Sequence, residues 1–206
     1  MKDLHALFRQ SLAGLRLLVV ATLVLGLVYP ASVWAFGAVA APWRAEGSLV
    51  TATGAHTTDA DEAVGSALLG QLTEDDGLFL PRLSAAGDGY DPLNTYGSNY
   101  GPESPDLVAA IAERRAEVAD REGVAESEVP PDAVTASGSG LDPDISVAYA
   151  VLQVARVAAA NGLTEGEVLR LVDDHTAGRT WGLLGEPHVN VLLLNIAVLQ
   201  AAEDDG

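Results

Sequence analysis

The sequence predicts an α+β fold in which a single N-terminal transmembrane helix is followed by one compact soluble domain of helices and short strands. Three observations support this prediction: a long uncharged apolar stretch near the N-terminus, several helix start and stop signals after it, and short apolar runs bounded by glycine and polar residues. With 206 residues, 49% of them apolar, the chain is long enough for one ordinary domain and an anchor.

The anchor is predicted from charge and length. No residue from Leu17 to Trp43 carries a formal charge, and this stretch exceeds the roughly 20 residues that a helix needs to cross a bilayer. A cleaved signal peptide is the alternative, because residues 17–28 could form its apolar core and AVAA at 38–41 offers small residues to a peptidase. Apolar residues continue past Pro30, further than a signal peptide requires, so we place a transmembrane helix at residues 17–41.

The orientation of the anchor follows from its flanking charges. Lys2, Arg9 and Arg16 precede the apolar stretch, whereas Arg44 after it is offset by Glu46. Because basic residues stay on the cytoplasmic side, we expect a single-pass protein of the plasma membrane. Residues 1–16 should be cytoplasmic, and residues 42–206 should form the extracytoplasmic soluble domain.

Charge also limits the function of the soluble domain. The net charge is -18, and residues 1–40 contribute three basic and one acidic residue, or +2, so the remainder carries -20. Such a surface repels phosphate backbones and disfavours nucleic acid as a partner. It could attract cations, although a solvated acidic surface is the simpler interpretation. The chain has no cysteine, which excludes disulfides and thiolate metal sites.

The first part of the soluble domain is predicted to contain short strands and a long loop. Gly47–Val50 and Gly77–Leu80 should be strands, and Gly65–Gln71 should be an apolar connection between them. Gly, Ser, Asn, Asp and Pro dominate residues 84–105. A loop of this length in a compact domain is usually functional or disordered.

Capping residues predict three helices after this loop. The helices should run from Ser104 to about Glu122, from Ser146 to Asn161, and onward from Thr164, where Thr164 and Glu167 have the spacing of a capping box. The core face of the third helix should contain Val168, Leu169, Leu171 and Val172. Val189–Leu199 is too short to span a bilayer and should be a core helix or strand.

The stretch TASGSGLDPDIS at 135–146 could be a phosphate-binding loop, a catalytic serine turn or a docking loop. It has no lysine to reach a phosphate, and its SGSG lacks the GxSxG pattern of a nucleophile elbow. The four histidines stand at 5, 56, 175 and 188, without the spacing of metal ligands. We therefore expect no catalytic residues and no metal site in this chain.

Six segments together resemble the C subunit of the Kdp-type ATP-driven potassium transporter. In chain order they are GSALLGQ at 65–71, FLPRLSA at 79–85, YGSNYGPESPDL at 96–107, VTASGSGLDPDIS at 134–146, AVLQVARVAAANGL at 150–163 and LLGEPHVNVLLLNIAVL at 183–199. The resemblance covers nearly the whole chain, including the single N-terminal membrane helix. Two departures are RLS at 82–84, where the family usually has Arg-Pro-Ser, and YGSN at 96–99, where it usually has Gly-Gly-Ser-Asn.

The resemblance implies a non-catalytic accessory subunit of a four-part potassium uptake complex. Its partners would be a potassium-binding membrane subunit, an ATP-hydrolysing P-type subunit and a small membrane peptide, with membrane lipid around the helix. The family role is assembly and activation, described as a catalytic chaperone that raises the ATP affinity of the hydrolysing subunit. Potassium would be the transported ion, and ATP the implied cofactor, with Gln153 as the suggested nucleotide contact. The predicted topology conflicts with that contact, because it places Gln153 outside the cytoplasm.

We therefore expect the soluble domain to lie over the outer mouth of the potassium-binding subunit, with its loops as the docking face. The expected interface residues are Arg82, Ser98, Asn99, Ser137, Ser139, Asp142 and Asn190. The competing interpretation of each is a polar group that satisfies nearby backbone. Competing functions are a membrane-anchored extracytoplasmic ligand-binding or sensor protein and, third, an anchored hydrolase.

Overall fold

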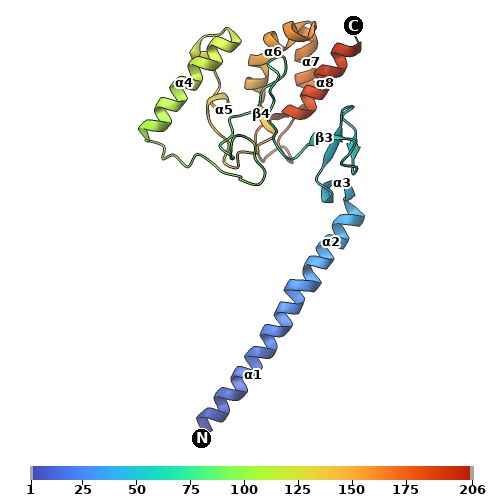
Figure 1. Ribbon diagram of the computed structural model, residues 1–206, viewed down its shortest axis with the longest axis vertical. Helices are drawn as coiled ribbons and strands as arrows, with labels where there is room; N and C mark the ends of the chain where they lie inside the picture. Colours follow the sequence, from blue (N-terminus) through green and yellow to red (C-terminus); the bar gives the residue numbers. More distant parts are fainter. Residues whose placement is uncertain (1, 205–206) are drawn as a thin grey trace. The chain divides into compact units, whose positions relative to one another are not determined.

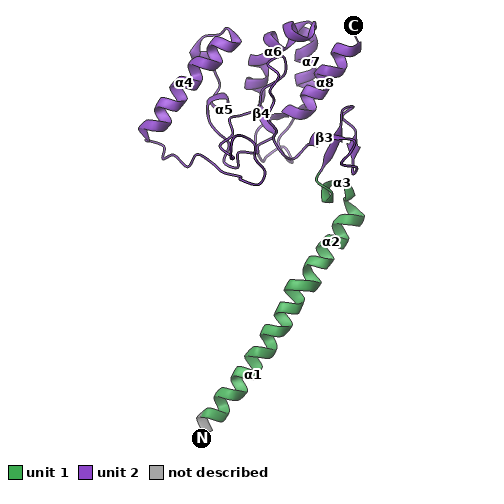
Figure 2. Ribbon diagram, viewed as in Figure 1, with its two compact units in different colours: residues 1–47 green, residues 48–206 purple. Residues whose placement is uncertain are grey.

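The computed structural model describes residues 2–204. The chain divides into two units, Met1–Gly47 and Ser48–Gly206, which Figure 2 shows in green and purple. The first unit is helical, and the second combines helices with short strands. This confirms the predicted α+β fold of one N-terminal apolar helix followed by one compact domain.

The first unit is a long helix that continues through a proline (Figure 1). Its parts are α1 (Lys2–Leu23), a π-helical turn (Val24–Val28), α2 (Tyr29–Ala40) and the short α3 (Pro42–Ala45). Pro30 has no N–H to donate, and a π-helical turn, which often accompanies such a break in the helical bonding, ends two residues before it. The Tyr29 N–H donates to the Val24 carbonyl oxygen, and the Ser32 hydroxyl donates to the Val28 carbonyl oxygen at 2.7 Å.

The apolar part of this helix has the properties of a membrane anchor. It spans Leu4–Ala40, reaches a mean hydropathy of 2.2 over 18 residues and has no buried residue in that window. At 1.5 Å per residue it extends about 55 Å, longer than the roughly 30 Å hydrocarbon core of a bilayer. The limits of the crossing segment at 17–41 and its orientation stay predictions.

The second unit contains two small antiparallel sheets of three strands each. The first has the order β2-β1-β3 and is built from β1 (Leu49–Thr51), β2 (His56–Thr57) and β3 (Ala63–Ser66). The second has the order β4-β6-β5 and is built from β4 (Asp144–Ser146), β5 (Thr176–Ala177) and β6 (His188–Asn190). The long stretch from 67 to 104 between them has no helix or strand, in agreement with the predicted loop at 84–105.

Helices form most of the core. They are α4 (Pro105–Glu122), the 3-10 turn Glu126–Glu128, α5 (Pro131–Val134), α6 (Val147–Asn161), α7 (Glu165–Asp174) and α8 (Val191–Asp204). Helices α6, α7 and α8 pack against one another (Figure 1). Their buried aliphatic side chains form one core with those of α4, α5 and the central strand β6.

The predicted helix boundaries are confirmed. Helix α4 begins directly after Ser104, although the Ser104 side chain makes no capping bond, and ends before Gly123 at φ +69°. Helix α6 ends before Gly162, which is also left-handed. Helix α7 has the predicted capping box between Thr164 and Glu167. Its core face is narrower than predicted, because Leu169 is 38% exposed.

Two predictions about the remaining segments need correction. Gly77–Leu80 is not a strand, because its backbone groups are bound by side chains, as described below. Gly65–Gln71 is not only a connection, because its first residues complete β3. The core element expected at Val189–Leu199 contains both strand and helix, with β6 ending at Asn190 and α8 following at once.

The cap of α6 gives a test of this fold. The Ser146 hydroxyl accepts the Tyr149 N–H at 3.0 Å and donates to the Asp132 carboxylate at 2.8 Å. We expect Ser146→Ala to lower the free energy of unfolding by about 1 to 2 kcal/mol, measured by urea titration of the full chain in detergent. The exposed Ser127 provides the control, since Ser127→Ala should cost less than about 0.5 kcal/mol. Equal losses for both variants would show that the cap does not hold α6.

Candidate functional site: a loop cluster and its buried support

Two buried amide side chains bind the segment Asp76–Leu80. The Asn195 amide of α8 accepts the Phe79 N–H at 2.8 Å and donates to the Phe79 carbonyl oxygen at 2.9 Å. The Gln153 amide of α6 accepts the Leu80 N–H at 2.8 Å and donates to the Leu80 carbonyl oxygen at 3.2 Å. These paired bonds to Phe79 and Leu80 replace those of a neighbouring strand, which explains why these two apolar residues join no sheet.

Arg156 binds both Gln153 and the backbone of the same segment. The Arg156 guanidinium donates to the Gln153 amide oxygen at 2.8 Å, to the Leu78 carbonyl oxygen at 2.9 Å and to the Asp76 carbonyl oxygen. The Arg156 guanidinium also binds the Glu122 carboxylate at 3.0 Å, and the Glu122 side chain is only 1% exposed. Arg121 binds the same carboxylate at 2.8 Å. The buried negative charge is therefore compensated by two guanidinium groups.

We use the name buried polar network for five side chains and the backbone segment that four of them bind. The side chains are Glu122, Gln153, Arg156, Asn161 and Asn195, and the backbone segment is Asp76–Leu80. Asn161 closes the network by donating to the Gly77 carbonyl oxygen at 2.7 Å. Gln153, the suggested nucleotide contact, is fully buried in it, and both ends of its amide are bonded.

A second hydrogen-bonded region begins shortly after this segment of the chain. We call it the loop cluster, and it consists of residues 82–99 and 135–142. Ser84 lies at its centre. The Ser84 hydroxyl donates to the Gly140 carbonyl oxygen at 2.7 Å and accepts the Tyr90 N–H at 2.8 Å. Backbone bonds join the same two loops, from the Ser137 N–H to the Leu83 carbonyl oxygen at 3.1 Å. The two loops therefore form one structural unit.

An ion pair and a tyrosine hydroxyl both bind Arg82, the first residue of the loop cluster. The Arg82 guanidinium binds the Asp142 carboxylate at 2.9 Å, with both side chains partly exposed. The Tyr90 hydroxyl donates to the Arg82 carbonyl oxygen. Burial, together with the nearby Asp142 charge, raises the pKa of Tyr90 well above its usual value. The hydroxyl therefore stays protonated and keeps donating over the whole physiological pH range.

The SGSG stretch at 137–140 is a tight turn in the cluster. Its serine hydroxyls accept backbone N–H groups, Ser137 from Gly140 at 2.8 Å and Ser139 from Leu141 at 3.1 Å. A Cβ at Gly140 would lie 2.6 Å from the Ala86 Cβ, so only glycine allows the two loops to approach this closely. A phosphate-binding loop would need free backbone N–H groups, but the serine hydroxyls already accept those of Gly140 and Leu141. This favours the docking interpretation of the stretch.

Four of the predicted interface residues take part in the bonds of the cluster: Arg82, Ser137, Ser139 and Asp142. Of these, Arg82 and Asp142 bind each other. Ser98 and Asn99 lie exposed at its edge, where a Cβ at neighbouring Gly97 would lie 2.7 Å from the Gly138 carbonyl oxygen. Whether any of the six contacts a partner stays a prediction.

Asn190 lies apart from the loop cluster and joins three other elements. Its amide donates to the Ala67 carbonyl oxygen at 3.0 Å and to the Asp144 carboxylate at 3.3 Å, and it accepts the Leu193 N–H at 3.1 Å. Burial raises the pKa of Asp144, while nearby His188 opposes this shift. Asn190 thus links the end of β3 to β4 and to the first turn of α8. Whether it also contacts a partner stays a prediction.

Sequence reasoning missed the residues that support the cluster, namely Ser84, Tyr90, Arg156 and Asn195. A signal was present for Asn195, because it is the amide inside the apolar run VLLLNIAVL. A polar side chain in the middle of a buried helix must find a partner. Ser84 and Tyr90 gave no such signal, since both types are ordinary in loops.

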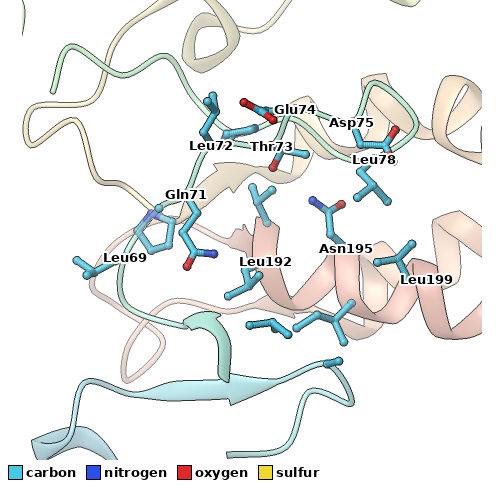
Figure 3. A pocket seen from close by; sticks show the side chains of 17 residues that line it. Leu69, Gln71, Leu72, Thr73, Glu74, Asp75, Leu78, Leu192, Asn195 and Leu199 are labelled. Atoms are coloured by element: carbon cyan, nitrogen blue, oxygen red, sulfur yellow. The ribbon is translucent and has the colours of Figure 1, made fainter. Parts of the chain in front are cut away.

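An apolar cavity of about 540 Å³ lies beside α8. Figure 3 shows Leu192, Asn195 and Leu199 of α8 beside the segment that carries Leu72 and Leu78. Glu74 and Asp75 also line the cavity. Within residues 2–204, no group of three or more His, Asp or Glu side chains is placed to hold a metal ion.

Comparison with known proteins identifies the family. Residues 11–200 match the family described as K+-transporting ATPase, c chain (KdpC). The chain belongs to this KdpC family. Two "Potassium-transporting ATPase KdpC subunit" proteins illustrate the similarity. That of Kineococcus radiotolerans is 55% identical, covering 95% of this chain and 96% of its own. That of Mycobacterium bovis is 44% identical, covering 92% and 97%.

A third such protein, from Beijerinckia indica, is 44% identical over 88% of each chain. Family membership makes this chain a subunit of a potassium-transporting ATPase. Its N-terminal apolar helix is long and apolar enough to cross a membrane, which suggests the anchor of a transporter subunit. The resemblance inferred from the six sequence segments is confirmed.

The buried polar network gives a prediction for Asn195. Asn195→Ala leaves the N–H and the carbonyl of Phe79 buried without partners, so we expect a loss of about 2 to 4 kcal/mol in the free energy of unfolding. Trypsin should then cleave after Arg82 faster than in the unaltered chain. Asn94, an exposed loop residue, provides the control, since Asn94→Ala should change neither quantity. A stable, trypsin-resistant Asn195→Ala variant would contradict the assigned role of the network.

Proposed function

We propose that this chain is the non-catalytic accessory subunit of an ATP-driven, high-affinity potassium uptake complex, and that the loop cluster is its docking face for assembly and activation. The partners would be the potassium-binding membrane subunit, the ATP-hydrolysing P-type subunit and the small membrane peptide. The observation that carries this proposal is the convergence of 82–99 and 135–142 into one bonded surface. Family membership supports the potassium transport context.

The cluster suits a docking role because it is ordered before any partner arrives. Side-chain to backbone bonds from Ser84, Ser137 and Ser139 hold its turns. Binding through such a surface loses little loop entropy, which leaves more of the contact energy for affinity. Ser98, Asn99 and Tyr96 remain exposed at its edge as polar and aromatic groups that a partner could bind.

The flanking charges of the anchor support an extracytoplasmic docking face over the outer mouth of the potassium-binding subunit. The soluble domain would then bring about 20 net negative charges near the entry route of a cation. Such a surface enriches potassium only within a Debye length of roughly 8 Å at physiological salt. Its contribution should therefore be modest and should fade as the ionic strength rises.

We propose that Gln153 acts through Leu80 and not through a nucleotide. Its amide is fully buried and bonded to Leu80 at both ends, so a nucleotide would first have to displace that segment. An effect of this chain on the ATP affinity of the hydrolysing subunit would then be indirect, through assembly. In this proposal Gln153 is a positioning residue of the loop that leads to Arg82.

The alternative function is a membrane-anchored extracytoplasmic ligand-binding or sensor protein. The apolar cavity beside α8 favours it, because 540 Å³ lies in the range of small-molecule sites. The two functions differ in partner dependence. A sensor should act alone, whereas an accessory subunit should work only when bound to the other subunits of the complex.

The docking face can be tested at Ser98, which is exposed. Ser98→Arg adds a large charged side chain without removing a support of the fold. We expect at least about tenfold less co-purification with the two large membrane subunits, because a charge forced into an interface costs several kcal/mol. Growth at micromolar potassium should fall in parallel.

Ser127→Arg, on the 3-10 turn and outside the residues of the loop cluster, is the matched control and should leave both readouts unchanged. Normal assembly and growth with Ser98→Arg would remove the loop cluster from the interface. Independent activity of the purified chain toward a small ligand would instead favour the sensor.

A further inference from the structure

The connection between β5 and β6 carries several strongly exposed apolar side chains. Every residue from 177 to 187 is exposed, and we call this segment the Trp181 loop. Its middle reads TWGLLG, in which Trp181 is 87% exposed, Leu183 80% and Leu184 58%. Three large apolar side chains within four residues, all facing solvent, indicate an interaction surface.

The loop is ordered despite this exposure. The Thr180 N–H donates to the Leu184 carbonyl oxygen at 2.8 Å, and the Gly182 N–H donates to the Arg179 carbonyl oxygen at 2.9 Å. An ion pair of 2.5 Å between Arg179 and Glu186 closes its base. Trp181 itself has a left-handed backbone at φ +54°, which is unfavourable for a bulky residue. The fold thus holds the indole at the tip in spite of a local cost.

The formal charge of the Trp181 loop differs from that of the rest of the domain. Residues 175–190 contain one basic and one acidic residue, a formal charge of zero, whereas residues 41–206 together carry -20. The loop is therefore a neutral segment on an acidic surface. It can approach a membrane or another acidic surface without the repulsion that the remainder of the domain would meet.

We propose that the Trp181 loop inserts its apolar tip into the lipid–water interface of the membrane in which the chain is anchored. Trp is enriched at that interface, because its ring is apolar while its N–H still finds a polar partner. A lipid surface requires no complementary shape. A stable protein interface usually buries about 800 Å² on each partner, more than three side chains on a hairpin tip supply.

The anchor makes even weak insertion effective. Only residues 41–47 separate the end of α2 from the second unit, and seven residues span at most about 25 Å. A short tether of this kind gives a local concentration in the millimolar range. Burial of Trp181 and two leucines then suffices for frequent contact. This inference is independent of the proposed docking role of the loop cluster.

Tryptophan fluorescence tests the proposal on the full chain. Trp34 and Trp43 are the other tryptophans, so a W34F/W43F chain reports on Trp181 alone. It would be reconstituted into phosphatidylcholine vesicles with lipids brominated near the headgroup. We expect about twofold lower emission than in unbrominated vesicles, and weaker quenching by bromines deep in the acyl chains, because interfacial groups lie near the headgroups.

The matched control places tryptophan at Leu93, which is 94% exposed and outside the Trp181 loop. In a W34F/W43F/W181F chain, Leu93→Trp should not be quenched by brominated lipid. Equal quenching at both positions would show that the whole domain lies on the bilayer, and would overturn an insertion specific to the loop. A blue-shifted Trp181 without lipid quenching would assign the loop to a protein contact, and a fully hydrated Trp181 would leave it in solvent. Both results overturn the proposal.

Discussion

The second unit depends on how the chain satisfies the backbone groups of Asp76–Leu80, a segment that belongs to no sheet. Backbone groups inside a protein must find partners, and Asp76–Leu80 finds them in the side chains of α6 and α8. Asn195 and Gln153 bind its peptide groups on consecutive residues, while Arg156 and Glu122 supply a compensated pair of charges at its start. Removal of one member leaves several buried groups unpaired, so the network acts as a unit.

This constraint positions the candidate site. The segment ends at Leu80, and the next charged residue, Arg82, is the first member of the loop cluster. The loop that follows has no helix or strand of its own before α4. Its order comes from Ser84, Tyr90 and the ion pair to Asp142. The buried network therefore determines where the docking loop begins, and the cluster determines its shape.

Sequence reasoning succeeded where the determining interactions are local. Helix ends at Gly123 and Gly162 and the capping box at Thr164 depend on a few neighbouring residues, so they could be predicted. The strand predicted at 77–80 failed because its partners lie 73 and 116 residues away on helices. No local pattern distinguishes a backbone bound by side chains from one bound by a strand.

The same distinction applies to the candidate site. The sequence predicts Arg82, Ser137, Ser139 and Asp142 as loop residues. It does not predict that their loops meet, because the contacts between the loops join residues 53 and 56 positions apart. Gln153 was predicted from the family resemblance as a nucleotide contact. Because Gln153 is buried, its amide binds the backbone of Leu80 inside the protein.

The most direct test of the central claim asks on which side of the membrane the loop cluster lies in the assembled complex. The chain has no cysteine, so single cysteines in place of Ser11 and Ser139 can be labelled selectively with a membrane-impermeant thiol reagent on intact cells. We expect Ser139→Cys to react in chains expressed without their partners and to be protected in the complex, while Ser11→Cys reacts in neither. Reaction of Ser11→Cys with no reaction of Ser139→Cys in either case would place the domain in the cytoplasm and contradict an extracytoplasmic docking role.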